Sequence, residues 1–524
     1  MSHPLRAASP LADGAEASHA QSALVSDRRI TSAIGREAAL VVLLATFVAF
    51  AFQGTRGLWE PDEGRYTNVA LHMLESGDWI NPALDHEHLH FAKPPLMYWA
   101  LATSYRVFGR NEWAVRLPNA LAFVCTALLV FGIARQLVPG RAVLAASSWV
   151  TMFGPVVAAN IVSTDTVLAL WETWAMYAFV SSGALGDRPI LSARIQLMWI
   201  AFALAFLTKG PPGLLPLGGI IAWFLWTGRA TALREIFAPP AVLAFFLIGG
   251  SWYWIVSMEH PGLLAHLIKG EVAQRVLSPI YHRNPGWFGW LRAYAPMLVL
   301  GSLPWAAVPL IARVMRQRFP AELALNNPIT RFLLCWFALP FTVLCVSQSR
   351  LPLYVLPLMV PIALLIVRAL PEAFVARRFA ATAAIGIAAV CLVGLKAAGA
   401  HVENARDGRA WARELAANVD MDAYDEVVFI DAQPTYTLNH YLGVEVERVE
   451  LSSTADSTTE YSAVEALCSE LADGERVLMI GRASYGAAIE SAARQCHPDG
   501  LHELKRLRDW VIWTVEPAPA QVGP

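Results

Sequence analysis

Long apolar runs separated by short polar segments repeat along the first 400 residues of the chain. Most of these runs are long enough for a helix that crosses the hydrocarbon core of a bilayer. They predict eleven membrane-spanning helices, near residues 36–54, 114–136, 141–164, 166–184, 195–208, 211–227, 240–258, 293–313, 330–346, 352–368 and 379–397. A short run at 96–108 and a break at Gly154 and Pro155 raise the count to thirteen if each adds a span.

Basic residues predict how these helices are oriented. Arginines gather in alternate loops, at 135–141, 188–194, 229–234, 313–318 and 368–378. Because cytoplasmic loops carry an excess of Lys and Arg, we expect these loops and the N-terminus inside the cell. Eleven and thirteen are both odd, so the C-terminus lies outside for either count.

The pattern changes near residue 400 to that of a soluble α/β domain. Helical periodicity at 404–418, 462–472 and 485–495, apolar runs at 427–430 and 477–480, and a hairpin around 502–516 alternate there. We therefore expect a disordered cytoplasmic tail at 1–35, a transmembrane domain at 36–398 with outer loops 55–95 and 259–292, and an outer domain at 399–524. Cys468 and Cys496 fall in this outer domain, as a disulfide or as two unpaired buried thiols.

Composition supports this class of protein. Hydrophobic residues make up 56% of the 524 positions and charged residues 16%, as in a polytopic α-helical membrane protein. No basic patch is evident, which argues against nucleic acid as a partner. The four other cysteines lie in apolar runs and are interpreted as packing residues.

The predicted orientation brings chemically active side chains to the outer membrane boundary. From Asp62 onward, helical spacing predicts a helix on the outer surface, with Asp62 as its cap and Gly77 at its end. Each candidate also has an ordinary structural explanation, since acidic residues favour helix starts and lysines snorkel at span ends. The candidate site residues are Asp62, Glu63, Arg65, Tyr66, Lys93, Asp165, Lys209, Arg275, Arg350 and Tyr354.

Seven motifs in order strengthen the functional interpretation. They are Asp-Glu-x-x-Tyr at 62–66, Ser-Gly-Asp-Trp at 76–79, Lys-Pro-x-x-x-Tyr-Trp at 93–99, Leu-Thr-Lys-Gly at 207–210, Glu-x-x-Gln-Arg at 271–275, Gly-Ser-Leu-Pro-Trp at 301–305 and Leu-Pro-x-Tyr-x-Leu-Pro at 351–357. Together they resemble the 4-amino-4-deoxy-L-arabinose transferase group within the protein mannosyltransferase superfamily.

The resemblance implies a GT-C glycosyltransferase in the bacterial inner membrane with about 11 to 13 transmembrane helices. Such an enzyme moves a sugar from a polyprenyl phosphate carrier, undecaprenyl phosphate in bacteria, to an envelope acceptor such as lipid A or another glycolipid or glycan. By this resemblance, Asp62 is the lead catalytic carboxylate and Asp165 a second acidic site residue. Lys93, Lys209, Arg275 and Tyr354 line the path of the donor phosphate, and Arg350 stands where relatives often carry a lysine.

One position departs from the family pattern. Ala92 precedes Lys93 where the aminoarabinose enzymes often have a glutamate linked to a bound metal. The sequence therefore predicts no metal and no cofactor, and the match to that particular sugar weakens.

Three alternatives stay open from the sequence alone. A protein O-mannosyltransferase would differ in its acceptor, which would be a protein. A transporter or lipid flippase would carry functional charges near the bilayer midplane, and Glu172 inside the run at 166–184 is such a charge. A structural scaffold with an external interaction domain is the third.

Overall fold

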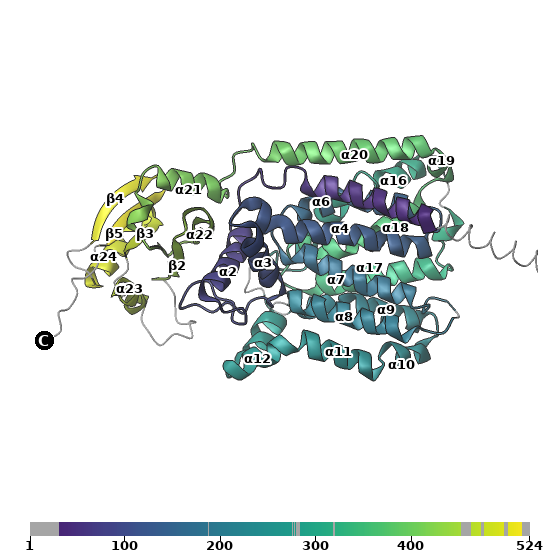
Figure 1. The fold of residues 1–524 in the computed structure, drawn as a ribbon, viewed down its shortest axis with the longest axis horizontal. Helices are drawn as coiled ribbons and strands as arrows, with labels where there is room; N and C mark the ends of the chain where they lie inside the picture. Colours follow the sequence, from purple (N-terminus) through teal and green to yellow (C-terminus); the bar gives the residue numbers. More distant parts are fainter. Residues whose placement is uncertain are drawn as a thin grey trace, which may run out of the picture.

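The computed structural model of the protein has a helical bundle, an outer helical layer and an α/β domain (Figure 1). It describes residues 31–186, 188–274, 276, 278, 283–317, 320–451, 463–472, 476–496 and 501–515. Most of the predicted tail at 1–35 lies outside this part of the chain. Its last five residues begin a helix, Thr31–Phe50.

The bundle is built from apolar helices that pack around one large core. Ala and other small residues in this core let neighbouring helices approach closely, as is typical of helices in a bilayer. Its main helices are α4 (Glu112–Leu137), α5 (Ala142–Val150), α6 (Phe153–Ala159), α7 (Thr164–Ser181), α8 (Ser192–Lys209), α9 (Leu215–Trp226), α11 (Pro239–Gly249), α12 (Ser251–Glu259), α15 (Gly289–Gly301), α16 (Ala307–Val314), α17 (Pro328–Val346), α18 (Met359–Ala369) and α20 (Arg378–Gly399).

Among the described residues, five helices are long and apolar enough to cross a membrane unbroken, and up to seven if each bent pair of helices forms one span. The eleven to thirteen spans stay a prediction. The pair α5 and α6 bends by 58° at the predicted break, just before Gly154 and Pro155. The apolar run near 240–258 is likewise divided, into α11 and α12. Hydropathy counted each run as one span, whereas the backbone divides several of them.

The outer layer consists of α2 (Asp62–Ser76) and α3 (Leu96–Phe108), which lie between the bundle and the C-terminal domain (Figure 1). Helix α2 ends at Gly77, which takes the predicted left-handed conformation with φ 72°. Its cap is Pro61, so Asp62 is the first helical residue and not the cap. Ten of its fifteen residues are buried, and it packs on α3 and on the C-terminal domain. The helix is therefore enclosed by protein, unlike the surface helix predicted from its periodicity.

The C-terminal domain contains a five-stranded sheet in the order β2-β1-β3-β5-β4. β1 is parallel to β2 and β3, whereas β5 is antiparallel to β3 and β4. Helices α21 and α22 cover one face of the sheet, and α23 and α24 cover the other. The elements are α21 (Gly408–Ala416), β1 (Glu426–Ile430), α22 (Thr437–Leu442), β2 (Glu445–Val449), α23 (Ala463–Ala472), β3 (Val477–Arg482), α24 (Gly486–Cys496), β4 (Leu501–Leu507) and β5 (Trp510–Val515).

Two elements of this domain, α22 and β2, were not expected from the sequence. The other helices and strands fall on the stretches that the apolar pattern indicated. Cys468 and Cys496 form a disulfide that joins α23 to α24, with their Cα atoms 5.1 Å apart. Of the two alternatives left open by the sequence, the structure has the bonded one.

Polar contacts attach the outer layer to the C-terminal domain. The backbone N–H of Glu60 donates to the Arg406 carbonyl at 2.9 Å. The Glu60 carboxylate accepts the backbone N–H of Thr437 at 2.7 Å. Gly64 leaves the room that this carboxylate occupies, because a Cβ there would lie 2.3 Å from Glu60 Oε1. Burial raises the pKa of Glu60 to about 7, although the hydrogen bond from Thr437 opposes the shift.

This raised pKa predicts a pH-dependent interface. Because the folded-state pKa lies above the unfolded value, the contribution of Glu60 is greatest below about pH 4.5 and is lost as the pH rises through about 7. Glu60→Gln should therefore change the melting temperature little near pH 5, and should raise it near pH 8 by the equivalent of up to ~3 kcal/mol. Thermal melts of the purified variant across this pH range measure the effect.

Glu87→Gln is the matched control, because Glu87 is an exposed carboxylate of the same outer region. Equal pH dependence of the wild type and Glu60→Gln would contradict the buried, neutral state of Glu60.

Candidate functional site

The first turn of α2 presents Asp62 and Arg65 beside each other. Asp62 Oδ1 accepts a hydrogen bond from Arg65 Nη2 at 2.5 Å. The Asp62 side chain is 49% exposed and that of Arg65 26%. Asp62 is thus an accessible carboxylate on a fixed helix, with a cation next to it.

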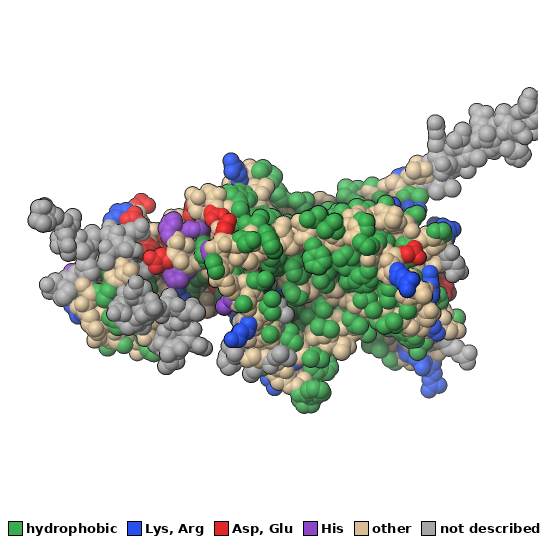
Figure 2. Space-filling view, turned by 90° about the horizontal axis from the view of Figure 1, so that it is seen from below, with side chains coloured by type: hydrophobic (Ala, Val, Ile, Leu, Met, Phe, Trp, Pro, Cys, Tyr) green, Lys and Arg blue, Asp and Glu red, His purple; other side chains and the backbone are tan. Residues whose placement is uncertain are grey.

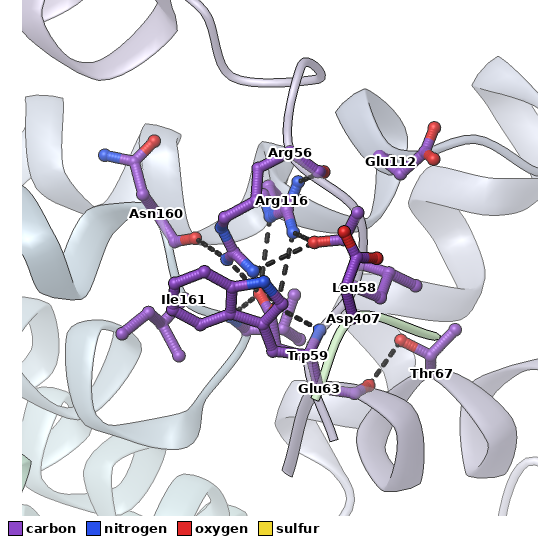
Figure 3. A network of polar contacts seen from close by, with 12 residues as sticks. Arg56, Leu58, Trp59, Glu63, Thr67, Glu112, Arg116, Asn160, Ile161 and Asp407 are labelled. Carbon is purple, nitrogen blue, oxygen red and sulfur yellow. Dashed lines mark hydrogen bonds and ion pairs between the residues drawn. The ribbon is translucent and has the colours of Figure 1, made fainter. Parts of the chain in front are cut away.

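Glu63, one residue further, points the other way into a buried network (Figure 3). Its carboxylate lies 2.7 Å from Arg56 Nη1 and 3.3 Å from Arg116 Nη2, and it is 1% exposed. It also accepts the backbone N–H groups of Trp59 at 2.8 Å and Val162 at 3.0 Å. Burial alone would raise the pKa of Glu63, but the two guanidinium groups outweigh it and lower the pKa to about 2. This arrangement favours a positioning role over the substrate contact expected from the sequence.

Tyr66 connects α2 to the start of α7. Its side chain is 6% exposed and lies close enough to Thr164, the residue before Asp165, for Thr164 to lower its pKa. Its ring lies 5.8 Å from that of Tyr98 on α3. Burial raises the pKa of Tyr66, so the phenol stays protonated at neutral pH. The structure therefore brings the α2 motif and the Asp165 motif together.

Asp165 and Lys209 form a buried ion pair between α7 and α8. Their side chains are 8% and 7% exposed, respectively. The cap of α7 is Ser163, whose hydroxyl accepts the Asp165 N–H at 3.3 Å, so the Asp165 carboxylate is not the cap. The Lys209 ammonium also lies 3.9 Å from the centre of the Tyr354 ring, within the range of a cation–π contact.

A cavity of about 470 Å³ opens beside this ion pair. Lys93, Lys209 and Tyr354 line it, and Lys93 Nζ donates to the Ala92 carbonyl at 2.9 Å. Most of the remaining wall is apolar, with Phe91, Leu168, Phe206, Leu215, Trp252, Tyr253, Leu264, Leu267, Ile268, Val276, Pro340, Val343, Leu344, Pro357 and Leu358 among its residues. The cavity thus combines fixed cations with a long hydrophobic surface.

Of the ten predicted residues, six that the structure describes do not line this cavity: Asp62, Glu63, Arg65, Tyr66, Asp165 and Arg350. Arg350 is 1% exposed, and its guanidinium donates to the carbonyls of Asn284, Gly286 and Cys345, each at 2.8 Å. These bonds attach the 283–286 segment to the end of α17, which favours a structural role. Arg275 lies outside the described residues.

Other residues of the site were not among those predicted. Glu172, which the sequence singled out only as a feature of a transporter, lines the cavity and is 4% exposed. A charge inside an apolar run was the signal for it. Arg56 and Arg116, which hold Glu63, gave no such signal, because nothing in the sequence pairs them with it.

The residue at position 92 does not fit the metal site that the resemblance implies. Ala92 lies in the cavity wall beside Lys93 and has no side-chain donor atom. The chemistry of this cavity is therefore derived from its own side chains.

Comparison with known proteins gives three similarities. The dolichyl-phosphate-mannose-protein mannosyltransferase family matches residues 92–254. An undecaprenyl phosphate-α-4-amino-4-deoxy-L-arabinose arabinosyl transferase of Edwardsiella ictaluri is 31% identical over 334 residues, which are 62% of this chain and 58% of the relative. Its counterpart in Pseudomonas savastanoi pv. phaseolicola is 32% identical over 337 residues, 63% of this chain and 61% of the relative.

A solved structure extends the similarity to almost the whole fold. The crystal structure of ArnT from Cupriavidus metallidurans bound to undecaprenyl phosphate aligns with a TM-score of 0.71 at 20% identity, covering 93% of this chain and 99% of that one. In sequence, the aligned region spans less than two thirds of the length of the curated relatives. The resemblance predicted from the motifs is confirmed: the chain is similar in sequence to the 4-amino-4-deoxy-L-arabinose transferases and to part of the protein mannosyltransferase family, and it has the fold of the ArnT crystal structure.

Proposed function

We propose that the protein is an inverting glycosyltransferase that takes its sugar from a polyprenyl phosphate carrier and transfers it to an acceptor in the bacterial envelope. The observation that carries this proposal is the cavity whose wall combines Lys93 and Lys209 with a long apolar surface. A lipid-linked sugar phosphate has the same division, with a charged head and a hydrocarbon chain. The ArnT structure with bound undecaprenyl phosphate supports this choice of carrier.

The buried pair of Lys209 and Asp165 suits a phosphate that gains charge. When the sugar leaves, a phosphodiester with one negative charge becomes a phosphate monoester with nearly two. A cation held in place stabilises this product-like charge more than that of the bound donor, which lowers the barrier. Asp165 and Tyr354 fix the position of the Lys209 ammonium, and Lys93 provides a second cation at the wall.

Asp62 is the proposed catalytic carboxylate. It is accessible, and α2 carries it to the start of α7. There Asp165 forms its ion pair with Lys209. A carboxylate on the face of the sugar opposite the phosphate can take the proton of an acceptor hydroxyl, which gives inversion. If the acceptor is an ionised phosphate, as on lipid A, Asp62 instead orients the acceptor or stabilises positive charge on the sugar. Arg65 holds the carboxylate in either case.

The Cys468–Cys496 disulfide supports an active site on the periplasmic side. Disulfides persist in oxidising compartments, so the C-terminal domain fits the periplasm better than the cytoplasm. This domain contacts the layer that carries Asp62. The predicted orientation of the spans gives the same side, and the multi-pass chain then resides in the inner membrane.

Removing the charge of Asp62 tests its proposed role as the reacting carboxylate. Asp62→Asn should lower the rate of sugar transfer by roughly 10²- to 10⁴-fold, because it removes the proposed base without changing side-chain size. Binding of undecaprenyl phosphate should be nearly unchanged. Turnover of purified protein with polyprenyl-phosphate-linked sugar, together with carrier binding, measures both effects.

Glu75→Gln is the control, because Glu75 lies in the last turn of the same helix and pairs with Arg110. Turnover of Asp62→Asn close to that of the wild type would reject the catalytic role.

Removing the charge of Lys209 tests its proposed contact with the donor phosphate. Lys209→Met should weaken binding of undecaprenyl phosphate by about tenfold to a hundredfold, the range expected for loss of one charged hydrogen bond. Titration of the detergent-solubilised protein with the carrier measures this affinity. Lys269→Met, which removes an exposed lysine, should bind as the wild type does.

Loss of Lys209 also leaves Asp165 buried without its cation, which destabilises the fold. The double variant Asp165→Asn/Lys209→Met removes both charges and separates binding from folding. If the double variant melts as the wild type does and still binds the carrier with wild-type affinity, Lys209 does not hold the phosphate.

A further inference from the structure

A histidine-rich segment of the outer loop lies against the C-terminal domain. Residues 85–90 read Asp-His-Glu-His-Leu-His, and their surroundings include the edge strand β2. In the space-filling view, His and acidic side chains gather where the C-terminal domain meets the rest of the molecule (Figure 2). Short histidine-rich segments are typical of metal binding.

One group of side chains joins three distant parts of the chain. His72 comes from α2, His86 from the histidine-rich segment and Glu445 from β2. His86 Nε2 lies 3.2 Å from Glu445 Oε2, and the two imidazole rings have centres 5.1 Å apart. One possible ligand atom from each residue lies within 4.8 Å of the other two.

A second group lies on the same loop and the same strand. It consists of Asp85, His88 and Glu447, whose ligand atoms also lie within 4.8 Å of one another. His88 Nδ1 is 2.8 Å from Asp85 Oδ1. Asp85 and Glu447 are 3% and 5% exposed, so two carboxylates are buried close to each other. A cation between such carboxylates reduces their mutual repulsion.

The strand explains why the two groups are neighbours. Side chains two residues apart in a strand point to the same side, so Glu445 and Glu447 both face the loop. Asp85, His86 and His88 are close in sequence and supply the matching donors. β2 is also an edge of the sheet, and such edges are commonly covered by a loop.

The donor set suits zinc among the common divalent ions. Imidazole nitrogen and carboxylate oxygen are both zinc ligands, bound at about 2.0–2.2 Å, which separates two ligands of a tetrahedral site by roughly 3.3 Å. The His86–Glu445 and His88–Asp85 pairs, at 3.2 Å and 2.8 Å, are close to that separation. Mg²⁺ and Ca²⁺ prefer all-oxygen sites, which the imidazoles of the first group do not provide.

We propose that these two groups form a zinc-binding site, in which His72, His86 and Glu445, and next to them Asp85, His88 and Glu447, attach the outer loop and α2 to β2 of the C-terminal domain. The site is structural, and none of its six residues lines the cavity that contains Lys93 and Lys209. Its existence does not depend on the proposed transferase activity.

Zinc retention by the full-length protein tests this site. The detergent-solubilised protein, without any oligohistidine tag, is stripped with EDTA, incubated with Zn²⁺ and dialysed, and its metal content is measured by mass spectrometry. We expect at least one zinc per wild-type chain. His86→Ala and Glu445→Gln should lose the zinc of the first group, and His88→Ala and Glu447→Gln that of the second.

Two neighbouring residues supply matched controls. Glu87→Gln and His90→Ala change the same segment but belong to neither group, so both should keep the zinc content of the wild type. Circular dichroism verifies that each variant is folded. A wild-type chain that retains no zinc, or folded ligand variants that retain as much as the controls, would overturn the proposal.

A second measurement tests what the metal does. If zinc attaches the C-terminal domain to the outer loop, its removal should speed protease cleavage in the connection at 400–407 between α20 and α21. Zinc should slow this cleavage again in the wild type and in Glu87→Gln, but not in folded His86→Ala. If the cleavage rate is independent of zinc in all three proteins, the metal does not attach the two parts.

Discussion

The buried carboxylate of Glu63 is the constraint on which the outer layer depends. Two guanidinium groups and two backbone N–H groups surround it. A buried charge without its partners is costly, and loss of one partner of a buried pair typically destabilises by about 3–5 kcal/mol. Arg116 belongs to α4 and Val162 to the segment before α7, so one side chain joins α2 to two parts of the bundle. This fixes the direction in which the first turn of α2 points.

That direction separates neighbouring residues into different roles. Glu63 points into the bundle, whereas Asp62, the residue directly before it, stays accessible. Tyr66, one turn later, contacts Thr164 and so brings the turn beside Asp165 and Lys209. The cavity wall itself combines Lys93, Glu172 and Lys209 with a mostly apolar surface. The proposed lipid phosphate would match this division, because its head and its chain prefer different solvents.

The sequence predicted the parts whose signal is local. Gly77 ends α2 because a helix end needs a left-handed residue there, and the β4–β5 hairpin follows from its own alternation. Strand β2 was missed because Glu445, Glu447 and Arg448 make it polar, and an edge strand needs no continuous apolar run. The pairing of Glu63 with Arg56 and Arg116, and the shape of the cavity, depend on contacts between distant segments. No pattern within one segment encodes them.

The bundle and the outer assembly are stabilised by different forces. Apolar packing holds the bundle, and neither protons nor metal ions change such contacts directly. The outer layer and the C-terminal domain meet through polar contacts as well as apolar ones, namely Glu60 with Thr437, Asn68 with Asn439, and Tyr105 with His440. The loop that contacts β2 continues within a few residues to Lys93 at the cavity wall. The position of this lysine therefore depends on polar contacts that solution conditions can alter, whereas the apolar wall of the cavity does not depend on them.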